Sequence, residues 1–273
     1  FATRDLASIM LMDSAGIQKQ DAEFVSKKRA KKGLPPVEPL YTSIQAELAI
    51  RQFVAINYDR PILVADGVTL TFRDAGHILG SAQVVLDIRE NGRKFRYVFS
   101  GDIGRGRDPI LRDPDVVDDV DYLQVESTYG DREHSARNTF APQVAELILE
   151  TIKKNGKVIV PAFSVGRTQQ MVYILHLLTG DGKIPKVPIF VDSPLSVNAT
   201  EVYRLHPECF NEDIYTFLHE KENPFGMDNL TYIREQSHSM KLNDLKEPAI
   251  IISASGRSEE RRVGKECTMT CRS

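Results

Sequence analysis

The chain begins with helical patterns of apolar and polar residues. Residues 3–32 predict a helix that ends in the basic run 27–32, after which closely spaced prolines require an extended chain. Thr42 and Gln45 have the spacing of a capping box in front of a second helix over 43–53. Two helices are therefore expected before any strand.

Strand patterns follow. The next segments are rich in β-branched and aromatic residues, and residues 90–92 have the Asn-Gly composition of a hairpin turn. The predicted strands are 68–75, 81–89, 94–102 and 121–128. This part of the chain is expected to form a mostly antiparallel sheet.

Strands and helices then alternate. The predicted helices are 139–154, 167–178 and 196–206, and the predicted strands are 157–163, 188–194 and 248–255. Such alternation indicates a parallel sheet with crossover helices. The fold class is therefore α/β, with the seam between its two parts near 130–140.

The composition is that of a folded globular protein. The chain has 273 residues, of which 41% are hydrophobic and 27% charged, enough for one large domain or two ordinary ones. No apolar run approaches the ~18 residues of a membrane helix. Cys209, Cys267 and Cys271 lack zinc-site spacing, and so few cysteines fit a reducing, cytoplasmic location. The net charge of −3 does not indicate a strongly basic surface, although a local basic groove is compatible with this net charge.

The two ends of the chain depart from these patterns. It opens at Phe1 almost directly in a helix, without an initiating methionine. Residues 257–273 have no hydrophobic period, and 257–267 look like the translation of a sequencing-adapter oligonucleotide. We therefore expect a non-native tail over 257–273 on an internal segment of a longer protein. The alternative is a genuine, solvated, charged terminus.

Two turns that follow strands carry candidate metal ligands. His77 lies between Gly76 and Gly80 in the stretch DAGHILGSA, with Asp74 three residues earlier, where it could orient the ring. Asp102 ends an apolar strand in the stretch FSGDIG. A histidine or aspartate in such a turn is often only structural. The glycine-rich context at strand ends favours a functional site.

A third polar cluster ends the strand that precedes the seam. The stretch ESTYGDREH begins with Glu126 and ends with His134, and it also holds threonine, tyrosine and arginine. A polar loop with a helix cap would have a similar composition, so the cluster alone leaves both interpretations open.

Two further clusters fit anion binding. In PAFSVGRTQQ, Ser164 and a glycine form the turn after a strand, and Arg167 opens a helix. Free N–H groups and the helix dipole favour an anion there, and an arginine can clamp a phosphate. The spacing is not that of a Walker A loop. Ser193 follows the next strand in VDSPLS, and such strand ends of a parallel sheet line one crevice.

In this order, DAGHILGSA, FSGDIG, ESTYGDREH, PAFSVGRTQQ, VDSPLS and IISASG resemble the β-CASP branch of the metallo-β-lactamase superfamily over roughly residues 1–256. This branch includes the endonuclease subunit of the cleavage and polyadenylation factor and RNase J. The resemblance implies a partial αββα metallo-β-lactamase sandwich over 1–130. A truncated β-CASP domain with a parallel, Rossmann-like sheet would follow over 131–256.

The resemblance also implies roles for the first three motifs. His77 would bind one of two zinc ions, and Asp102 would bridge both. A shared hydroxide would attack the phosphorus in line. Glu126 would be the acidic catalytic residue and would orient a downstream histidine that protonates the leaving oxygen.

RNA is the partner that the resemblance implies. The β-CASP domain would clamp single-stranded RNA, with contacts from Arg167, Ser164, Ser193 and His134. No membrane partner is expected, and a homodimer is a further expectation.

The sequence departs from the family at both ends. The family's His-x-His-x-Asp-His run is absent, and Arg257 follows the SASG turn where a glycine-rich stretch and two later histidines are expected. Catalytic zinc takes three protein ligands, so this chain is predicted to be inactive and an intact parent to be a zinc-dependent ribonuclease.

Three alternatives stay open. One is a metallo-β-lactamase-fold hydrolase of a small molecule, such as a lactonase or thioesterase. Another is a non-catalytic β-CASP scaffold partner. The third is an α/β domain that carries these motifs by chance.

Overall fold

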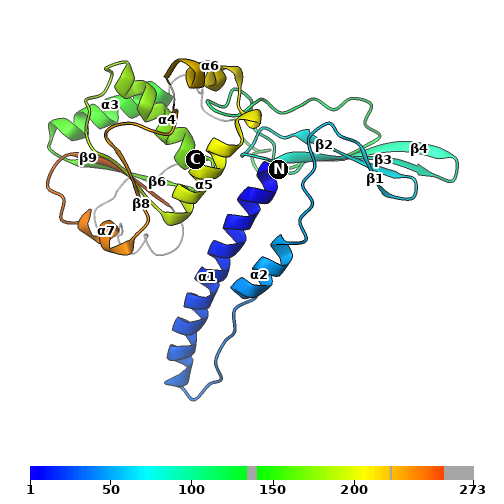
Figure 1. Cartoon of the computed structure of the whole chain (residues 1–273), viewed down its shortest axis with the longest axis horizontal. Coiled ribbons are helices and arrows are strands. Elements are labelled where there is room, and N and C mark those ends of the chain that lie inside the picture. The colour runs from blue at the N-terminus through cyan, green and yellow to red at the C-terminus, as the bar shows by residue number, and fades with distance from the viewer. Residues whose placement is uncertain (134–139, 222, 255–273) are drawn as a thin grey trace. The chain divides into compact units, whose positions relative to one another are not determined.

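A computed structural model describes residues 1–133, 140–221 and 223–254. The chain divides into two compact units (Figure 1). Unit 1 comprises Phe1–Glu126 and Val202–Cys209, and unit 2 comprises Ser127–Glu201 and Phe210–Ser273. The division falls four residues before the predicted boundary at 130. Val202–Cys209, which the sequence boundary places in the second domain, groups with unit 1.

Three predicted features lie outside the described residues: His134, the tail 257–273 and the last two residues of the SASG turn. Within the described part of the chain, no helix combines the length and the apolar character needed to cross a membrane.

Two helices open unit 1. The long α1 (Ala2–Ala30) is followed by α2 (Ser43–Ile50), which lies alongside it (Figure 1). The predicted capping box is confirmed, because the Gln45 N–H donates to Thr42 Oγ1 at 3.3 Å and the Thr42 N–H donates to Gln45 Oε1 at 2.8 Å. The second helix ends three residues earlier than predicted.

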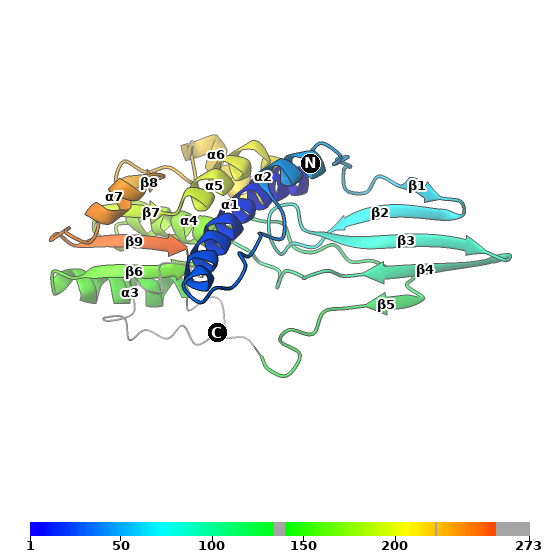
Figure 2. The same cartoon turned by 90° about the horizontal axis from the view of Figure 1, so that it is seen from below.

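The sheet of unit 1 has five strands in the order β1-β2-β3-β4-β5 (Figure 2). They are β1 (Ile62–Ala65), β2 (Val68–Asp74), β3 (Ala82–Glu90), β4 (Arg93–Phe99) and β5 (Tyr122–Gln124). The first four pair antiparallel, as predicted, and β5 pairs parallel to β4. Asn91 and Gly92 have φ of 49° and 77°, as a type I′ turn requires, so the predicted hairpin is confirmed.

Unit 2 contains a parallel sheet in the order β6-β9-β7-β8. Its strands are β6 (Lys157–Ala162), β7 (Ile189–Asp192), β8 (Leu230–Ile233) and β9 (Ala249–Ala254). Its described helices are α3 (Phe140–Lys153), α4 (Arg167–Gly180), α6 (Glu212–Lys221) and α7 (Gln236–Lys241). Helix α5 (Pro194–Leu205) begins in unit 2, and its last four residues group with unit 1. The predicted α/β class with a parallel sheet is confirmed.

The strand order places a late strand inside this sheet. Strands β6, β7 and β8 follow one another in one direction across the sheet, and the connection from β8 runs back to place β9, the last described strand, between β6 and β7. Open α/β sheets bind ligands at the carboxyl ends of their strands. Ser164 and Ser193 follow β6 and β7 at this edge.

Candidate functional site

The two predicted metal ligands lie side by side. His77 is in the turn between β2 and β3, and Asp102 is in the turn after β4. His77 Nε2 lies 3.8 Å from Asp102 Oδ2, and the two side chains are 41% and 72% exposed. A contact so open to water contributes little to stability, and both side chains are accessible to a ligand.

A close backbone contact holds the two turns together. The Gly104 N–H donates to the Ala75 carbonyl at 2.8 Å. A Cβ atom at Gly104 would lie 1.8 Å from the Gly76 carbonyl oxygen, so no side chain fits there. Gly76 itself has a φ of 58° and would meet Pro114 N at 2.7 Å with a Cβ. The glycines therefore fix the separation between His77 and Asp102.

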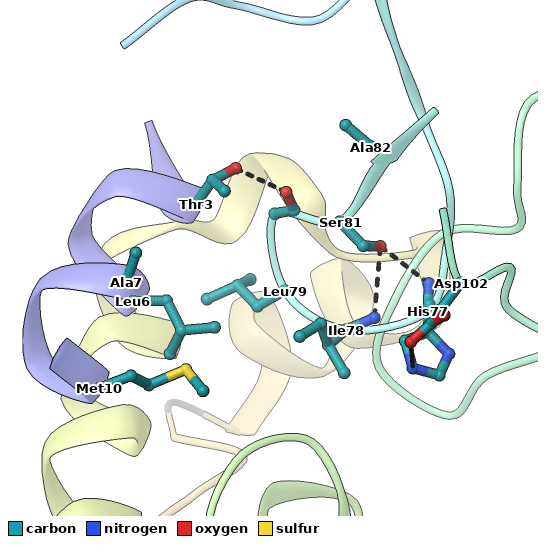
Figure 3. A pocket seen from close by; sticks show the side chains of 11 residues that line it. Thr3, Leu6, Ala7, Met10, His77, Ile78, Leu79, Ser81, Ala82 and Asp102 are labelled. Atoms are coloured by element: carbon teal, nitrogen blue, oxygen red, sulfur yellow. Dashed lines mark hydrogen bonds and ion pairs between the residues drawn. The ribbon is translucent and has the colours of Figure 1, made fainter. Parts of the chain in front are cut away.

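Ser81 closes the turn that carries His77. Its Oγ accepts the N–H groups of His77 at 3.0 Å and Ile78 at 3.3 Å (Figure 3). Tyr58 donates its hydroxyl proton to the Ser81 carbonyl at 2.8 Å. Burial raises the pKa of Tyr58 far above its usual value, so the hydroxyl keeps the proton that it donates.

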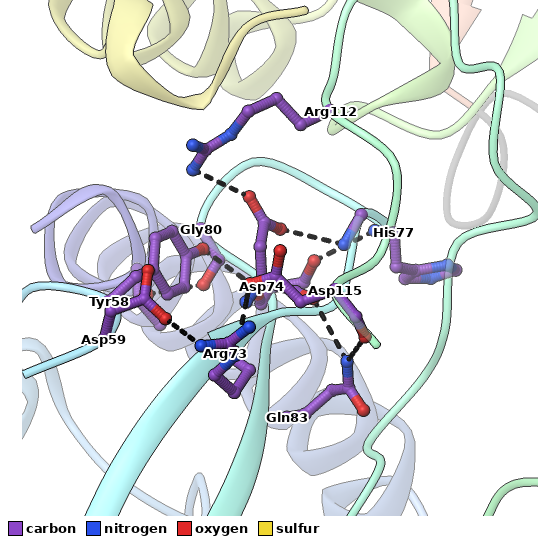
Figure 4. Close-up of polar contacts among 12 residues, drawn as sticks. Tyr58, Asp59, Arg73, Asp74, His77, Gly80, Gln83, Arg112 and Asp115 are labelled. Atoms are coloured by element: carbon purple, nitrogen blue, oxygen red, sulfur yellow. Dashed lines mark hydrogen bonds and ion pairs between the residues drawn. The ribbon is translucent and has the colours of Figure 1, made fainter. Parts of the chain in front are cut away.

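Asp74 supports the same turn from below (Figure 4). Its buried carboxylate accepts the Gly76 N–H at 2.9 Å and pairs with Arg112 Nη2 at 3.1 Å. Burial raises the pKa of Asp74, while the Gly76 hydrogen bond and Arg112 oppose that rise. The predicted orienting role therefore acts through the backbone of the turn and not through a contact with the His77 ring.

A second layer anchors Asp74. Its backbone N–H donates to Asp115 Oδ2 at 2.9 Å, and Gln83 Nε2 donates to the carbonyls of Asp115 at 2.7 Å and Asp74 at 3.2 Å. These bonds tie the segment around residue 115 to β2 and β3. No local sequence pattern predicts these bonds, because the partners lie up to 41 positions apart.

Glu126 contacts the turn that carries Asp102. Its Oε1 accepts the Ile103 N–H at 2.9 Å, and its own N–H donates to Ser100 Oγ at 3.1 Å. The predicted catalytic carboxylate therefore touches the residue that follows Asp102. Its catalytic role stays a prediction.

A mostly apolar pocket of about 250 Å³ lies beside the pair (Figure 3). The first turns of α1 form one wall, and the turn between β2 and β3 forms the other. The lining residues are Thr3, Leu6, Ala7, Met10, His77, Ile78, Leu79, Gly80, Ser81, Ala82 and Asp102. The predicted metal ligands thus stand at the edge of a cavity that an apolar group could enter.

The predicted anion-binding residues of unit 2 meet at the carboxyl ends of β6 and β7. Ser164 Oγ lies 3.3 Å from Ser193 Oγ. Arg167 is the first residue of α4, and its Nη1 donates to Gln170 Oε1 at 3.4 Å. RNA contact by these side chains remains a prediction.

Gln169, which the sequence analysis missed, organises this edge. Its fully buried side chain accepts the Gly166 N–H at 2.8 Å. Its Nε2 donates to the carbonyls of Ser164 at 3.2 Å and Ser196 at 3.3 Å, and to Thr200 Oγ1 at 3.0 Å. The three-residue spacing of Gly166 and Gln169 at a helix start was the available signal.

The described residues do not complete a zinc site. Zinc bonds to nitrogen and oxygen of about 2.0–2.2 Å could span the 3.8 Å between His77 Nε2 and Asp102 Oδ2. Over residues 1–133, 140–221 and 223–254, however, no three His, Cys, Asp or Glu side chains gather so as to hold a metal ion. Catalytic zinc takes three protein ligands, so this pair would supply only part of a set.

Known proteins resemble this chain over most of its length. Residues 168–265 match the Beta-Casp domain. An RNase J-like protein of Methanocaldococcus jannaschii is 36% identical over 219 residues, which cover 79% of this chain and 49% of that protein. Ribonuclease TTHA0252 of Thermus thermophilus is 29% identical over 219 residues, which cover 80% and 49%.

A third relative extends the match. Transcription termination factor FttA of Thermococcus kodakarensis is 31% identical over 259 residues, 93% of this chain and 37% of that protein. The chain thus spans about half the length of the first two relatives and less of the third. Together with the mixed α/β fold and the predicted order of motifs, these matches show that the chain belongs to the β-CASP branch of the metallo-β-lactamase superfamily.

Proposed function

We propose that this protein is a metal-dependent hydrolase of RNA phosphodiester bonds. The observation that carries the proposal is the pairing of His77 with Asp102 at 3.8 Å, with Glu126 on the adjoining turn. Two relatives that span most of the chain carry ribonuclease in their names. A cytoplasmic location and a homodimer belong to the same proposal.

His77 and Asp102 are proposed as metal ligands. His77 would bind through a neutral ring nitrogen, and Asp102 through its carboxylate. Zinc, when bound in such enzymes, lowers the pKa of its water to about 7 and so supplies hydroxide at neutral pH. Because the described residues supply two ligands, we propose that the 273-residue chain binds zinc poorly and does not cleave RNA.

Glu126 and the supporting turns are proposed to hold this site rigid. Glu126 fixes the Asp102 turn through the Ile103 N–H, and Ser81 and Asp74 fix the His77 turn. A ligand pair held by backbone contacts loses little freedom when it binds, which favours tight and oriented binding.

The strand ends of unit 2 are proposed to contact RNA. Ser164 and Ser193 present neighbouring hydroxyls, and Arg167 adds a guanidinium that suits a phosphate. His134 is part of the same proposal, although it lies outside the described residues.

The decisive experiment begins with the genomic locus on both sides of this reading frame. If the locus encodes an upstream His-x-His-x-Asp-His run and histidines after the SASG turn, the longer product should cleave single-stranded RNA in the presence of zinc. His77→Ala should abolish that cleavage. A longer product that holds zinc but leaves RNA intact would overturn the proposal. Cleavage by the 273-residue chain itself, abolished by His77→Ala, would overturn its proposed inactivity.

A small-molecule hydrolase is the second candidate. The apolar pocket beside His77 is the observation that favours it, since an acyl or lactone substrate would need such a cavity. An acyl thioester offered to the same longer product separates the two, because only this second candidate predicts its turnover. A product that turns over neither substrate would favour the non-catalytic scaffold.

A further inference from the structure

The end of α1 concentrates positive charge on a chain whose net charge is −3. Five of the six residues 27–32 are basic, and Lys27, Lys28, Lys31 and Lys32 are all exposed. Phe24, Lys27, Lys28 and Lys31 recur at the spacing of one helix face. Lys32 follows directly after them. We call Phe24 and the four lysines Lys27, Lys28, Lys31 and Lys32 the basic face.

Most of these basic side chains form no ion pair with a described carboxylate. Arg29 donates to the Pro35 carbonyl at 2.8 Å and so has a structural role. Among the described residues, no carboxylate lies within ion-pair distance of any lysine of the basic face. Lys28 instead lies over the Phe24 ring, 4.2 Å from its centroid. The helix dipole favours cations in a last turn, but it does not require four lysines at one end.

The chemistry of the basic face suits a single-stranded nucleic acid. Ammonium groups neutralise backbone phosphates, and an aromatic ring among them can stack on a base. Phe24 is 46% exposed, so part of its ring is accessible. An acidic peptide would also meet the ammonium groups, but it has no bases to stack.

The helix itself links the basic face to the candidate site. Met10 lines the pocket beside His77, and Lys31 is the C-cap residue of α1. The two residues are 21 positions apart along this continuous helix. At 1.5 Å per residue these positions are about 32 Å apart. A stacked strand that rises ~3.4 Å per nucleotide covers this distance in about nine nucleotides.

We propose that the basic face is an RNA-binding surface separate from the candidate metal site, and that it holds the backbone of single-stranded RNA about nine nucleotides from that site. The proposal rests on the proposed function for the identity of the substrate. It predicts that RNA shorter than about nine nucleotides cannot reach both places at once.

The test measures binding of fluorescently labelled 20-nucleotide oligouridine to the full chain by anisotropy, with EDTA present and at several salt concentrations. The quadruple variant K27A/K28A/K31A/K32A is compared with K94A/K153A/K154A/K246A, which removes the same charge from four other exposed lysines. Circular dichroism establishes that both variants remain folded.

We expect the first variant to bind at least tenfold more weakly and the control to stay within about twofold. Each lost phosphate contact should lower the salt slope by ~0.7, or by about 3 in all. An equal loss in both variants, no loss in either, or no binding by the unmodified chain would overturn the proposal. Polyglutamate bound as tightly as RNA would assign the basic face to an acidic partner instead.

This test is independent of the proposed hydrolysis, because EDTA removes the metals and no cleavage is measured. For the longer product, loss of cleavage in His77→Ala with unchanged RNA binding separates the two sites. If the proposed hydrolase fails but the basic face binds RNA, the inference stands as a binding surface only.

Discussion

At the scale of single residues, the candidate site depends on positions where atoms have almost no room. Gly104 touches the backbone of the His77 turn, and Asp74 places a carboxylate in a buried position beneath it. These residues do not carry the proposed chemistry themselves. They determine whether His77 and Asp102 stay within reach of one ligand.

Gly104→Ala should destabilise unit 1. The new methyl group would lie 1.8 Å from a backbone oxygen, so one of the two turns must move. We expect a loss of about 1–3 kcal/mol in the free energy of unfolding, measured in urea, as for other overpacked positions. Gly16→Ala is the matched control, because nothing lies within 4 Å of that helical glycine. It should be neutral or stabilising by up to ~1 kcal/mol.

Asp74→Asn should change how stability depends on pH. Burial raises the pKa of Asp74 above its model-compound value of 3.8, so the folded state binds this proton more tightly than the unfolded state does. The stability that protonated Asp74 contributes is complete below pH 3.8 and is lost as the pH rises through the raised value. The advantage of the unmodified chain over Asp74→Asn should therefore shrink with rising pH in urea titrations. An advantage that grows with pH would mean that the Arg112 ion pair outweighs burial.

At the scale of elements, α1 is fastened at its beginning. Thr3 Oγ1 donates to the Gly80 carbonyl at 2.6 Å. His206 is 9% exposed and lies between two carboxylates, with Nε2 at 2.9 Å from Asp5 Oδ2 and Nδ1 at 2.7 Å from Glu208 Oε1. The start of α1 is thus joined to a segment about 200 positions later in the chain.

His206→Ala should loosen the first turns of α1. Removing the imidazole leaves Asp5 and Glu208 without their shared partner, which we expect to cost about 1–3 kcal/mol in the free energy of unfolding. Amide hydrogen exchange over residues 2–10 should accelerate. His219→Ala, at an exposed position, is the control and should change neither quantity. Unchanged exchange in His206→Ala would show that α1 is held by its apolar contacts alone.

The same contact predicts a response to acid. Burial opposes ionisation of Asp5, but hydrogen bonds from His206 and Arg4 outweigh it and hold the pKa of Asp5 below 3.8. Its contribution is present above pH 3.8 and is lost as the pH falls through the lowered value. The acid sensitivity of α1 should therefore be weaker in Asp5→Asn, as measured by hydrogen exchange between pH 2 and 5.

The sequence predicted most α-helices and strands and missed four of those that the structure describes. Periodicity identified α1, α3 and α4, whereas β1, β8 and α7 are four to six residues long and show no period of their own. The ten-residue helix α6 was missed as well. The strand predicted over 121–128 is only three residues long, because the Glu126 N–H bonds to the Ser100 hydroxyl and not to a neighbouring strand.

The site was predictable only in part, for a similar reason. Local motifs, taken in their order along the chain, predicted His77, Asp102 and Glu126. Gln169 also bonds to Ser196 and Thr200, which lie 27 and 31 positions away, so its spacing from Gly166 showed only part of its role. No local pattern predicts the hydrogen bond from Arg112 to Asp74, which lies 38 positions earlier.

At the scale of the whole chain, the parallel sheet of unit 2 depends on β9, the last of its described strands. β9 has four consecutive buried residues and pairs with both β6 and β7. Ile250→Ala, at a fully buried position, should cost about 2–5 kcal/mol, and Ile250→Val about 0.5–1.5 kcal/mol. Hydrogen exchange should accelerate in all four strands of this sheet in the alanine variant. Acceleration confined to β9 would mean that β6 and β7 are stable without it.

The placement of β9 also bears on how the chain is made. A ribosome delivers β6 and β7 long before the strand that separates them, and unit 1 waits for Val202–Cys209. Each unit needs a segment that is synthesised late, so neither can finish folding when its first strands leave the ribosome. Apolar strand edges therefore stay uncovered during synthesis. A nascent chain halted before residue 249 should accordingly be captured by chaperones and cut by proteases. Once β9 has been synthesised, both the capture and the proteolysis should stop.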